Sequence, residues 1–313
     1  MTTSDKFLYL VSGIVGLLVF ASAVGLTLKR RATTERGKSI VDNLIARTNA
    51  WWGMIAILVV AFFLGRISTI VLFSAVSFFA LREFVTLTPT RPGDHNALSV
   101  AFFLIVPFQY YLIWSEWYSL FTILIPVYAF LLLPSVSVLA QDTEAFLERV
   151  SKIQWGLMVS VYCISHAPAL LVLDIPGFAG QNALLLFYMM LIAQISDVFQ
   201  YVFGTLFGKT KIAPLVSPNK TVEGLIGGAL CSVLVGAAMW WITPFTPVQS
   251  AGMALVIVLM GFLGGLVMSA IKRSLGAKDW GTMIKGHGGV LDRFDSVCFA
   301  APVFFHFTRY FFT

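Results

Sequence analysis

Apolar runs long enough to cross a membrane recur along the whole of this chain, and they limit what it can fold into. A helix needs about 20 apolar residues to cross the hydrocarbon core of a bilayer. The sequence predicts ten such helices, at residues 7–28, 51–64, 67–81, 97–113, 118–139, 153–173, 183–203, 225–243, 248–271 and 296–312. We therefore expect an all-α integral membrane protein.

The composition agrees with this fold class. Of the 313 residues, 58% are hydrophobic and 12% are charged, and the mean hydropathy is +0.87, which excludes an ordinary soluble domain. The net charge of +6 would suggest nucleic acid in a soluble chain, but in a membrane protein it reflects orientation, so we expect no nucleic-acid partner. The three cysteines lie scattered in apolar segments without metal or redox spacing, and we interpret them as packing residues. The first run is too long for a signal peptide and is predicted to be a retained helix.

The second and third predicted spans are short, and a single bent helix over 51–81 is the alternative. The distribution of positive charge favours two spans. With ten spans and the N-terminus outside, 18 of the 21 Lys and Arg residues fall on the inner side. A single bent helix would move the basic segment 29–50 to the other face. We predict that 29–50 forms an interfacial helix. We further predict a single integral domain, with a helical scaffold over 1–193 and a catalytic membrane region over 194–313.

A polar stretch, Ser269 to Ser296, separates the last two predicted spans. It contains five basic residues, three aspartates and four glycines close around His287: Lys272, Arg273, Lys278, Lys285, Arg293, Asp279, Asp292, Asp295, Gly281, Gly286, Gly288 and Gly289. Cations and clustered glycine amides suit phosphate oxygens. Carboxylates would repel those oxygens unless a hard divalent metal lies between them. The stretch therefore predicts a metal–phosphate site at the membrane surface.

A second polar stretch interrupts the inner end of the seventh span. An ionised Asp197 inside a membrane helix costs several kcal/mol unless it is paired or hydrated. Asp197 and Tyr201 stand four residues apart and share a helix face. A polar contact between helices is the alternative, and we retain it for Gln194. For Asp197 we favour a functional role, because the loop 204–224 that follows supplies lysines and hydroxyls on the same predicted inner face as the first stretch. The two stretches are expected to form one site.

Together these residues resemble the phosphatidate cytidylyltransferases, also called CDP-diacylglycerol synthases. The signature of that family is filled in register by Ser269, Lys272, Arg273, Lys278, Asp279, His287, Gly288, Gly289, Asp292, Arg293 and Asp295. The second stretch matches the family at Asp197, Tyr201, Gly204, Gly208, Lys209, Pro214, Ser217, Pro218, Lys220, Thr221 and Gly224. The resemblance is specific over roughly 194–296 and only general, as several membrane helices, before that.

The resemblance implies that CTP and phosphatidate react to give CDP-diacylglycerol and pyrophosphate, in phospholipid biosynthesis. A phosphomonoester has a second pKa of about 6, so its attacking oxygen is already ionised and no general base is required. Catalysis would then depend on metal ions, cations and positioning. The implied cofactor is Mg²⁺, and a second metal or a monovalent cation is left open. The implied partners are CTP, phosphatidate and the lipid bilayer, and a homodimer is left open. The site would face the cytoplasm from a bacterial inner membrane.

The resemblance also assigns roles to residues. Asp292 is the metal ligand that we favour, and Asp279 and Asp197 are further candidates. Asp295 is equally an ion-pair partner of Arg293 or Lys272. The expected catalytic residues are Asp292, Lys272, Arg293, Asp279 and His287, with His287 as a hydrogen-bond partner rather than a base. The expected substrate-binding residues are Lys209, Ser217, Lys220, Thr221, Arg273, Lys278, Gly288, Gly289 and Tyr201.

The chain departs from the family pattern at two positions. Gly265 stands where the family has an Asp that is a metal ligand, so Asp197, Asp279 or Glu223 would have to substitute for it. Lys285 stands where a proline or small residue is usual. Three alternatives remain: a cytidylyltransferase for another lipid phosphate, such as an isoprenoid-glycerol phosphate; a related protein that binds lipid without catalysis; and a membrane transporter, which the crowding of polar residues on one face argues against.

Overall fold

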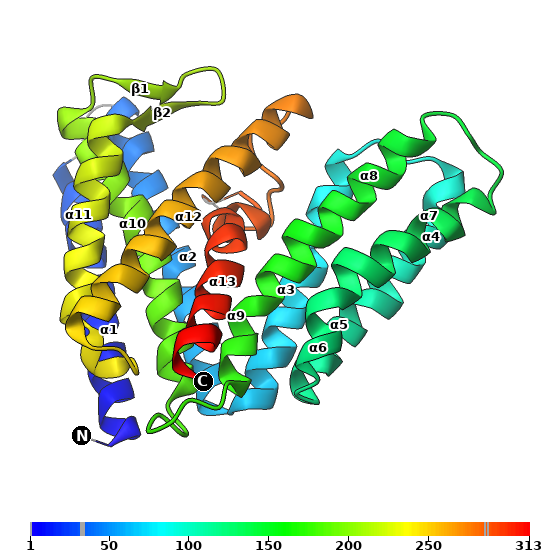
Figure 1. Ribbon diagram of the computed structural model, residues 1–313. Coiled ribbons are helices and arrows are strands. Elements are labelled where there is room, and N and C mark those ends of the chain that lie inside the picture. Colours follow the sequence, from blue (N-terminus) through cyan, green and yellow to red (C-terminus); the bar gives the residue numbers. More distant parts are fainter. Residues whose placement is uncertain (1, 32–34, 285, 287) are drawn as a thin grey trace.

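The structure of the chain, a computed structural model, describes residues 2–31, 35–284, 286 and 288–313. It is built almost wholly from helices (Figure 1). The long helices are α1 (Thr3–Arg31), α2 (Glu35–Phe63), α3 (Arg66–Leu87), α10 (Asn182–Phe207), α11 (Val222–Ala238), α12 (Pro247–Ser274) and α13 (Leu291–Phe312).

Between α3 and α10 the chain forms three further helical rods from shorter pieces. The pieces are α4 (His95–Val100) and α5 (Val106–Trp114), α6 (Tyr118–Ile123) and α7 (Phe130–Val138), and α8 (Phe146–Leu157) and α9 (Ile164–Ala169). Within each rod the two pieces are joined by π-helical turns over Ala101–Ile105, Leu124–Ala129 and Met158–Cys163. Short 3₁₀ turns complete the helical structure at Pro92–Asp94, Leu170–Val172 and Trp240–Ile242.

Eight of the described helical rods are long and apolar enough to cross a membrane. Many large apolar side chains on them are exposed, such as Phe63 at 86% and Phe103 at 75%, as expected for surfaces that face lipid. The chain is therefore a helical integral membrane protein. Each of the ten predicted segments falls on a helical stretch, whereas the number of crossings and the orientation of the chain stay predictions.

The chain turns between α2 and α3, so a single bent helix over 51–81 is excluded. Gly65 takes a φ of 98° between the two helices, a value that side chains with a Cβ rarely adopt. Residues 35–50 are helical, but they form the first half of α2, which continues without a break to Phe63. The interfacial position of 29–50 stays a prediction. The sequence from Lys38 to Trp52 contains no glycine or proline that would end a helix there.

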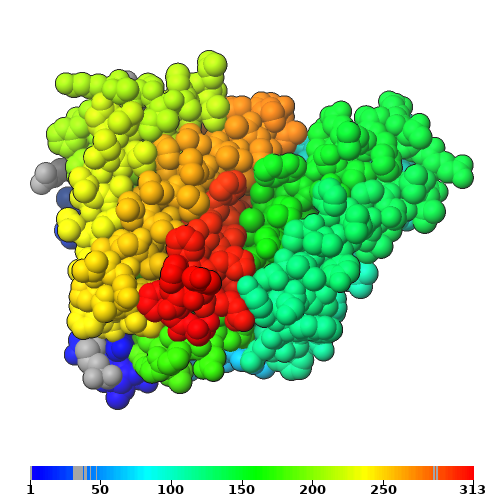
Figure 2. All heavy atoms as spheres, viewed as in Figure 1, coloured from blue at the N-terminus to red at the C-terminus, as the bar shows by residue number. Residues whose placement is uncertain are grey.

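Helices α10, α11, α12 and α13 pack together and carry the polar stretches. A two-stranded antiparallel hairpin, β1 (Lys211–Ala213) and β2 (Ser217–Thr221), connects α10 to α11. The hairpin lies at the same end of the molecule as the C-terminal end of α12, and both chain termini lie at the opposite end (Figure 1). Figure 2 shows α13, in red, filling the surface between α12 and the green segments. Because α13 also packs on α3 and α9, it connects this group of four helices to the helices that precede α10 in the chain.

Candidate active site

A polar pocket of about 280 Å³ lies where α10, β2, α12 and α13 meet. Both predicted stretches contribute to its lining. The lining residues are Asp197, Gln200, Tyr201, Ser217, Asn219, Lys220, Thr221, Gly224, Leu225, Phe262, Gly265, Ser269, Asp292, Arg293 and Asp295. The prediction that the two stretches come together is confirmed by this shared pocket, whereas its use as a functional site stays a prediction.

Close packing of α10 against α11 places Lys220 in this pocket. Thr221 begins α11 as its N-cap, and its hydroxyl accepts a hydrogen bond from the amide of Gly224 at 3.1 Å. A Cβ on Gly224 would lie 2.8 Å from the carbonyl oxygen of Gln200, so only glycine allows this approach. Lys220 directly precedes the cap and is thereby directed at α12, where its ammonium donates to the carbonyl oxygen of Phe262 at 3.3 Å.

The ammonium of Lys220 lies among both acidic and basic groups. Its nitrogen is 4.6 Å from the centre of the Phe262 ring, in a cation–π contact. Burial lowers the pKa of Lys220, nearby Lys272 lowers it further, and the carboxylates of Asp197 and Asp295 oppose this shift. The pocket therefore holds a cation next to a pair of carboxylates.

Asp292 is fully engaged by protein donors. One of its oxygens accepts from the ammonium of Lys272 at 2.7 Å, and the other accepts from the amides of Trp280 and Gly289 at 2.8 and 2.9 Å. Lys272 and Asp292 are both buried, and removing one member of such a pair costs about 3–5 kcal/mol. Asp292 therefore connects Trp280 and Gly289, which lie between α12 and α13, to Lys272 on α12. This structural role was not foreseen, and its assignment as a metal ligand stays a prediction.

Glu83, on α3, is the site residue that the sequence interpretation missed. Its two carboxylate oxygens accept hydrogen bonds from the amides of Val290 and Leu291, each at 2.9 Å. These amides stand at the N-terminus of α13, where a negative charge is favourable. Glu83 thus fixes the start of the helix that carries Asp292, Arg293 and Asp295. The available signal was that Glu83 is the only acidic residue of α3, but the predicted span ended at residue 81 and left Glu83 in a loop.

Several predicted residues lie outside the lining of the pocket. Lys209, Lys278 and Asp279 are exposed. Arg273 is exposed and donates to the carbonyl oxygens of Val216 and Ala277, at 3.4 and 3.1 Å, so it connects α12 to the hairpin. His287 and Lys285 fall outside the described residues.

The two predicted phosphate-binding glycines are used within the protein in this structure. The amide of Gly289 binds Asp292. Gly288 has a φ of 81°, and a Cβ there would lie 2.6 Å from a carboxylate oxygen of Asp292. Gln194 makes the predicted contact between helices, donating to the carbonyl oxygen of Arg293 at 3.1 Å.

The pocket offers two carboxylates to a divalent metal ion. Within the described ranges, no group of three or more His, Cys, Asp or Glu side chains is placed to hold a metal by itself. Asp197 and Asp295, however, both line the pocket. Mg²⁺ typically keeps several waters and binds through one or two carboxylates together with substrate phosphates. These two carboxylates meet that requirement, and Asp295 replaces Asp279 in the candidate ligand set.

Comparison with known proteins identifies the family. The model of the cytidylyltransferase family matches residues 45–311, which is most of the chain. The chain belongs to this family. The resemblance inferred from the two polar stretches is thereby confirmed.

Two kinds of relative show how far the similarity extends along the chain. The uncharacterized protein YnbB of Escherichia coli is 36% identical over 305 residues, which cover 95% of this chain and 96% of the relative. The phosphatidate cytidylyltransferase of Staphylococcus aureus is 46% identical over 118 residues, or 37% of this chain and 45% of that protein. The enzyme of the same name from Staphylococcus haemolyticus is 44% identical over the same length. The match thus spans less than half of the length of these two phosphatidate cytidylyltransferases.

Proposed function

We propose that this cytidylyltransferase transfers the cytidylyl group of CTP to phosphatidate, forming CDP-diacylglycerol and pyrophosphate. The observation that carries the proposal is the polar pocket itself. It presents the cations of Lys220 and Arg293 beside the carboxylates of Asp197 and Asp295, and it is built on membrane-length helices. A lipid phosphate and a nucleotide can therefore meet there without the lipid leaving the bilayer.

The arrangement suits nucleotidyl transfer between two anions. An oxygen of the lipid phosphate forms a bond to the α-phosphorus of CTP, and the bond from that phosphorus to the β-phosphate oxygen breaks to release pyrophosphate. The phosphate is ionised near neutral pH, so no residue has to remove a proton. Lys220 and Arg293 reduce the repulsion between the anions and orient them. Mg²⁺, held by Asp197 and Asp295 together with substrate phosphates, would supply further charge neutralisation.

The membrane location of this reaction follows from its two substrates. CTP reaches the protein from water, and the headgroup of phosphatidate lies at the surface of the bilayer. The proposed location is a bacterial inner membrane with the pocket facing the cytoplasm. The relatives with a named activity support phosphatidate as the substrate, and the family supports CTP.

One observation favours a second candidate, a member that binds lipid phosphate without turnover. A Cβ on Gly265 would lie 2.7 Å from the ammonium nitrogen of Lys220. The ammonium thus lies beside the position where the family resemblance implies a metal-binding carboxylate. A weaker metal site would slow transfer while leaving the phosphate-binding cations in place.

The decisive experiment supplies purified protein in detergent with Mg²⁺, CTP labelled at the α-phosphate, and a panel of lipid phosphates. The panel contains phosphatidate, lysophosphatidate and an isoprenoid-glycerol phosphate. Labelled CDP-diacylglycerol and an equal amount of pyrophosphate are expected with phosphatidate. Transfer to another lipid phosphate of the panel, without transfer to phosphatidate, would show that this other lipid is the substrate. Saturable phosphatidate binding without a labelled product would support the non-catalytic candidate. Because no gradient exists in detergent, turnover there also excludes a transporter.

A further inference from the structure

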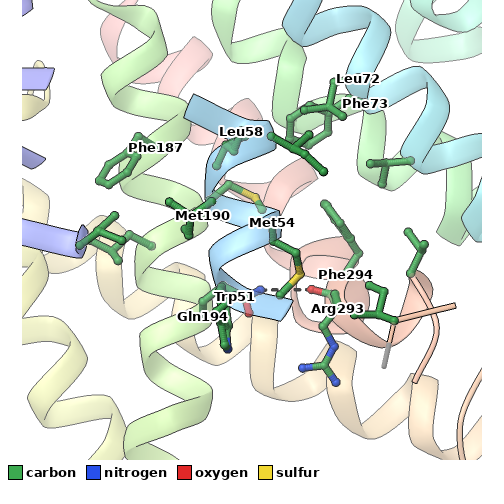
Figure 3. Close-up of a pocket in the computed structure, with 17 residues that line it drawn as sticks. Trp51, Met54, Leu58, Leu72, Phe73, Phe187, Met190, Gln194, Arg293 and Phe294 are labelled. Carbon is green, nitrogen blue, oxygen red and sulfur yellow. Dashed lines mark hydrogen bonds between the residues drawn. The ribbon is translucent and has the colours of Figure 1, made fainter. Parts of the chain in front are cut away.

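A second cavity, of about 240 Å³, lies next to the polar pocket between α1, α2, α3, α10 and α13. Its walls are apolar along most of their length (Figure 3). Met54 and Leu58 of α2 face Phe187 and Met190 of α10 across it, and Phe73 of α3 closes one end. At the other end the apolar lining gives way to Gln194 and Arg293.

Arg293 lines both cavities, so it lies on the wall between the apolar cavity and the polar pocket. Its backbone is fixed by the hydrogen bond from Gln194 to its carbonyl oxygen. Its Nε is buried and has no hydrogen-bond partner within the part of the chain that the structure describes. A buried donor of this kind is costly unless a ligand satisfies it, and a guanidinium suits a phosphate in particular.

We propose that the apolar cavity holds one hydrocarbon chain of the lipid-phosphate substrate, with the phosphate beside Arg293. This inference rests on the proposed function. An anionic amphiphile fits, because its hydrocarbon chain matches the apolar walls and its phosphate matches the end of the cavity at Arg293. A nucleotide does not fit, because the ribose and base would leave polar groups unpaired against the apolar walls.

The size and opening of the cavity agree with a single chain that enters from the bilayer. Sites for whole drug-sized ligands are about 300–1,000 Å³. This smaller cavity therefore takes part of one chain, and the second chain stays in the lipid. Ile57, one of the lining residues, is 57% exposed, so the lining of the cavity reaches the surface of the protein at α2.

The first test fills the cavity and varies the length of the lipid chain. Met54→Trp places a large ring in the cavity, and Val60→Trp places the same ring on the exposed side of the same helix, where Val60 is 55% exposed. For Met54→Trp, the KM for dipalmitoyl phosphatidate should rise at least tenfold, while the KM values for dihexanoyl phosphatidate and CTP change less than twofold. Val60→Trp should match the wild type. Met190→Phe is a milder filling variant if Met54→Trp does not fold. An equal change for both chain lengths, or no change in either filling variant, would refute the acyl-chain site.

The second test does not depend on turnover. A phosphatidate analogue with a terminal diazirine on one chain is photolysed with the wild-type protein without CTP, and the adducts are mapped by mass spectrometry. Adducts on the peptides that contain Met54 and Met190 are expected, and unlabelled phosphatidate but not phosphatidylcholine should compete with them. Adducts spread over exposed helix faces without competition would overturn the proposal. If phosphatidate competes with these adducts but the protein transfers no nucleotide, the proposed function is refuted and the acyl-chain site is retained.

Discussion

At the scale of single residues, the site combines groups held by the protein with groups left available to a ligand. Asp292 belongs to the first kind, since Lys272 and two backbone amides occupy its oxygens. Lys220 and Arg293 belong to the second, because both line the pocket, Lys220 donates to a single carbonyl oxygen, and the Nε of Arg293 has no partner among the described residues. The same aspartate that a family signature presents as catalytic is therefore also the support of the loop.

The variant Asp292→Asn tests this double role. We expect pyrophosphate release to fall at least 100-fold, and the free energy of unfolding to fall by about 3 kcal/mol because the buried Lys272 loses its counter-charge. Activity is measured with CTP and phosphatidate, and stability by unfolding in detergent. Asp279→Asn, at an exposed position of the same loop, is the matched control and should change stability by no more than about 0.5 kcal/mol. Turnover near that of the wild type in Asp292→Asn would remove Asp292 from the site.

Gly265→Asp should be tolerated and should lower the Mg²⁺ concentration needed for half-maximal activity. A Cβ at this position meets only the end of the Lys220 side chain, which can move at little cost, and the aspartate adds a carboxylate to the pocket that Asp197 and Asp295 line. The measurement is a Mg²⁺ titration of pyrophosphate release. Gly265→Asn has the same size without the charge and should not shift the titration. If both variants fail to fold, the local packing requires glycine and the prediction is wrong.

At the scale of elements, α13 depends on a helix far away in the sequence. Its first amides are capped by Glu83, and it presents Asp292, Arg293 and Asp295 within its first two turns. The hairpin is positioned in a similar way, because the carboxylate of Glu223 on α11 accepts hydrogen bonds from the amides of Lys209 and Thr210. Glu223 is thus engaged in holding the loop and does not line the pocket.

Removing the cap on α13 should affect both stability and activity. We expect Glu83→Ala to lower the free energy of unfolding by about 1–3 kcal/mol, because two half-buried amides lose their acceptor. Activity should fall more than tenfold, since the start of α13 shifts relative to the pocket. Thr86→Ala, on the exposed side of the same helix, is the matched control and should leave both quantities unchanged. A fully active Glu83→Ala variant would show that the position of α13 does not depend on this cap.

At the scale of the whole molecule, the hairpin and the C-terminal end of α12 lie at one end and both termini at the other (Figure 1). Because both termini lie at the same end, the arrangement agrees with an even number of membrane crossings. The charge distribution of the sequence predicts that the end with the hairpin faces the cytoplasm. The two cavities share only α10 and α13 and meet at Arg293. Under the proposed function, a lipid from the side and a nucleotide from the water would therefore reach Arg293 from different directions.

Cysteine labelling in intact cells tests this topology. In a variant whose native cysteines are replaced, Asn219→Cys and Lys278→Cys should both be protected from a membrane-impermeant maleimide, because both positions are predicted to face the cytoplasm. Tyr310→Cys, an exposed position near the C-terminus, should be labelled from outside. A permeant maleimide is the control for reactivity at each site. Opposite labelling of positions 219 and 278 would contradict a shared site.

Particular residues show which part of this protein can be predicted from sequence. The apolar runs predicted the membrane helices, because the thickness of the hydrocarbon core sets their length. The two polar stretches predicted one shared site, because charges and glycines are costly next to lipid unless a ligand or partner uses them. The charge pattern did not show that residues 35–50 continue as one helix to Phe63, because charge alone does not indicate where a helix ends.

The sequence by itself therefore determined the class of the fold, the family and the stretches that form the pocket. Only the tertiary structure decided that Glu83 caps α13, that the oxygens of Asp292 are occupied, and that Arg293 lies between an apolar and a polar cavity. Each of these depends on contacts between side chains and backbone groups far apart along the chain, such as the pair Glu83 and Leu291, 208 residues apart. Helix packing angles and side-chain directions create these contacts, and no local pattern of residues encodes them.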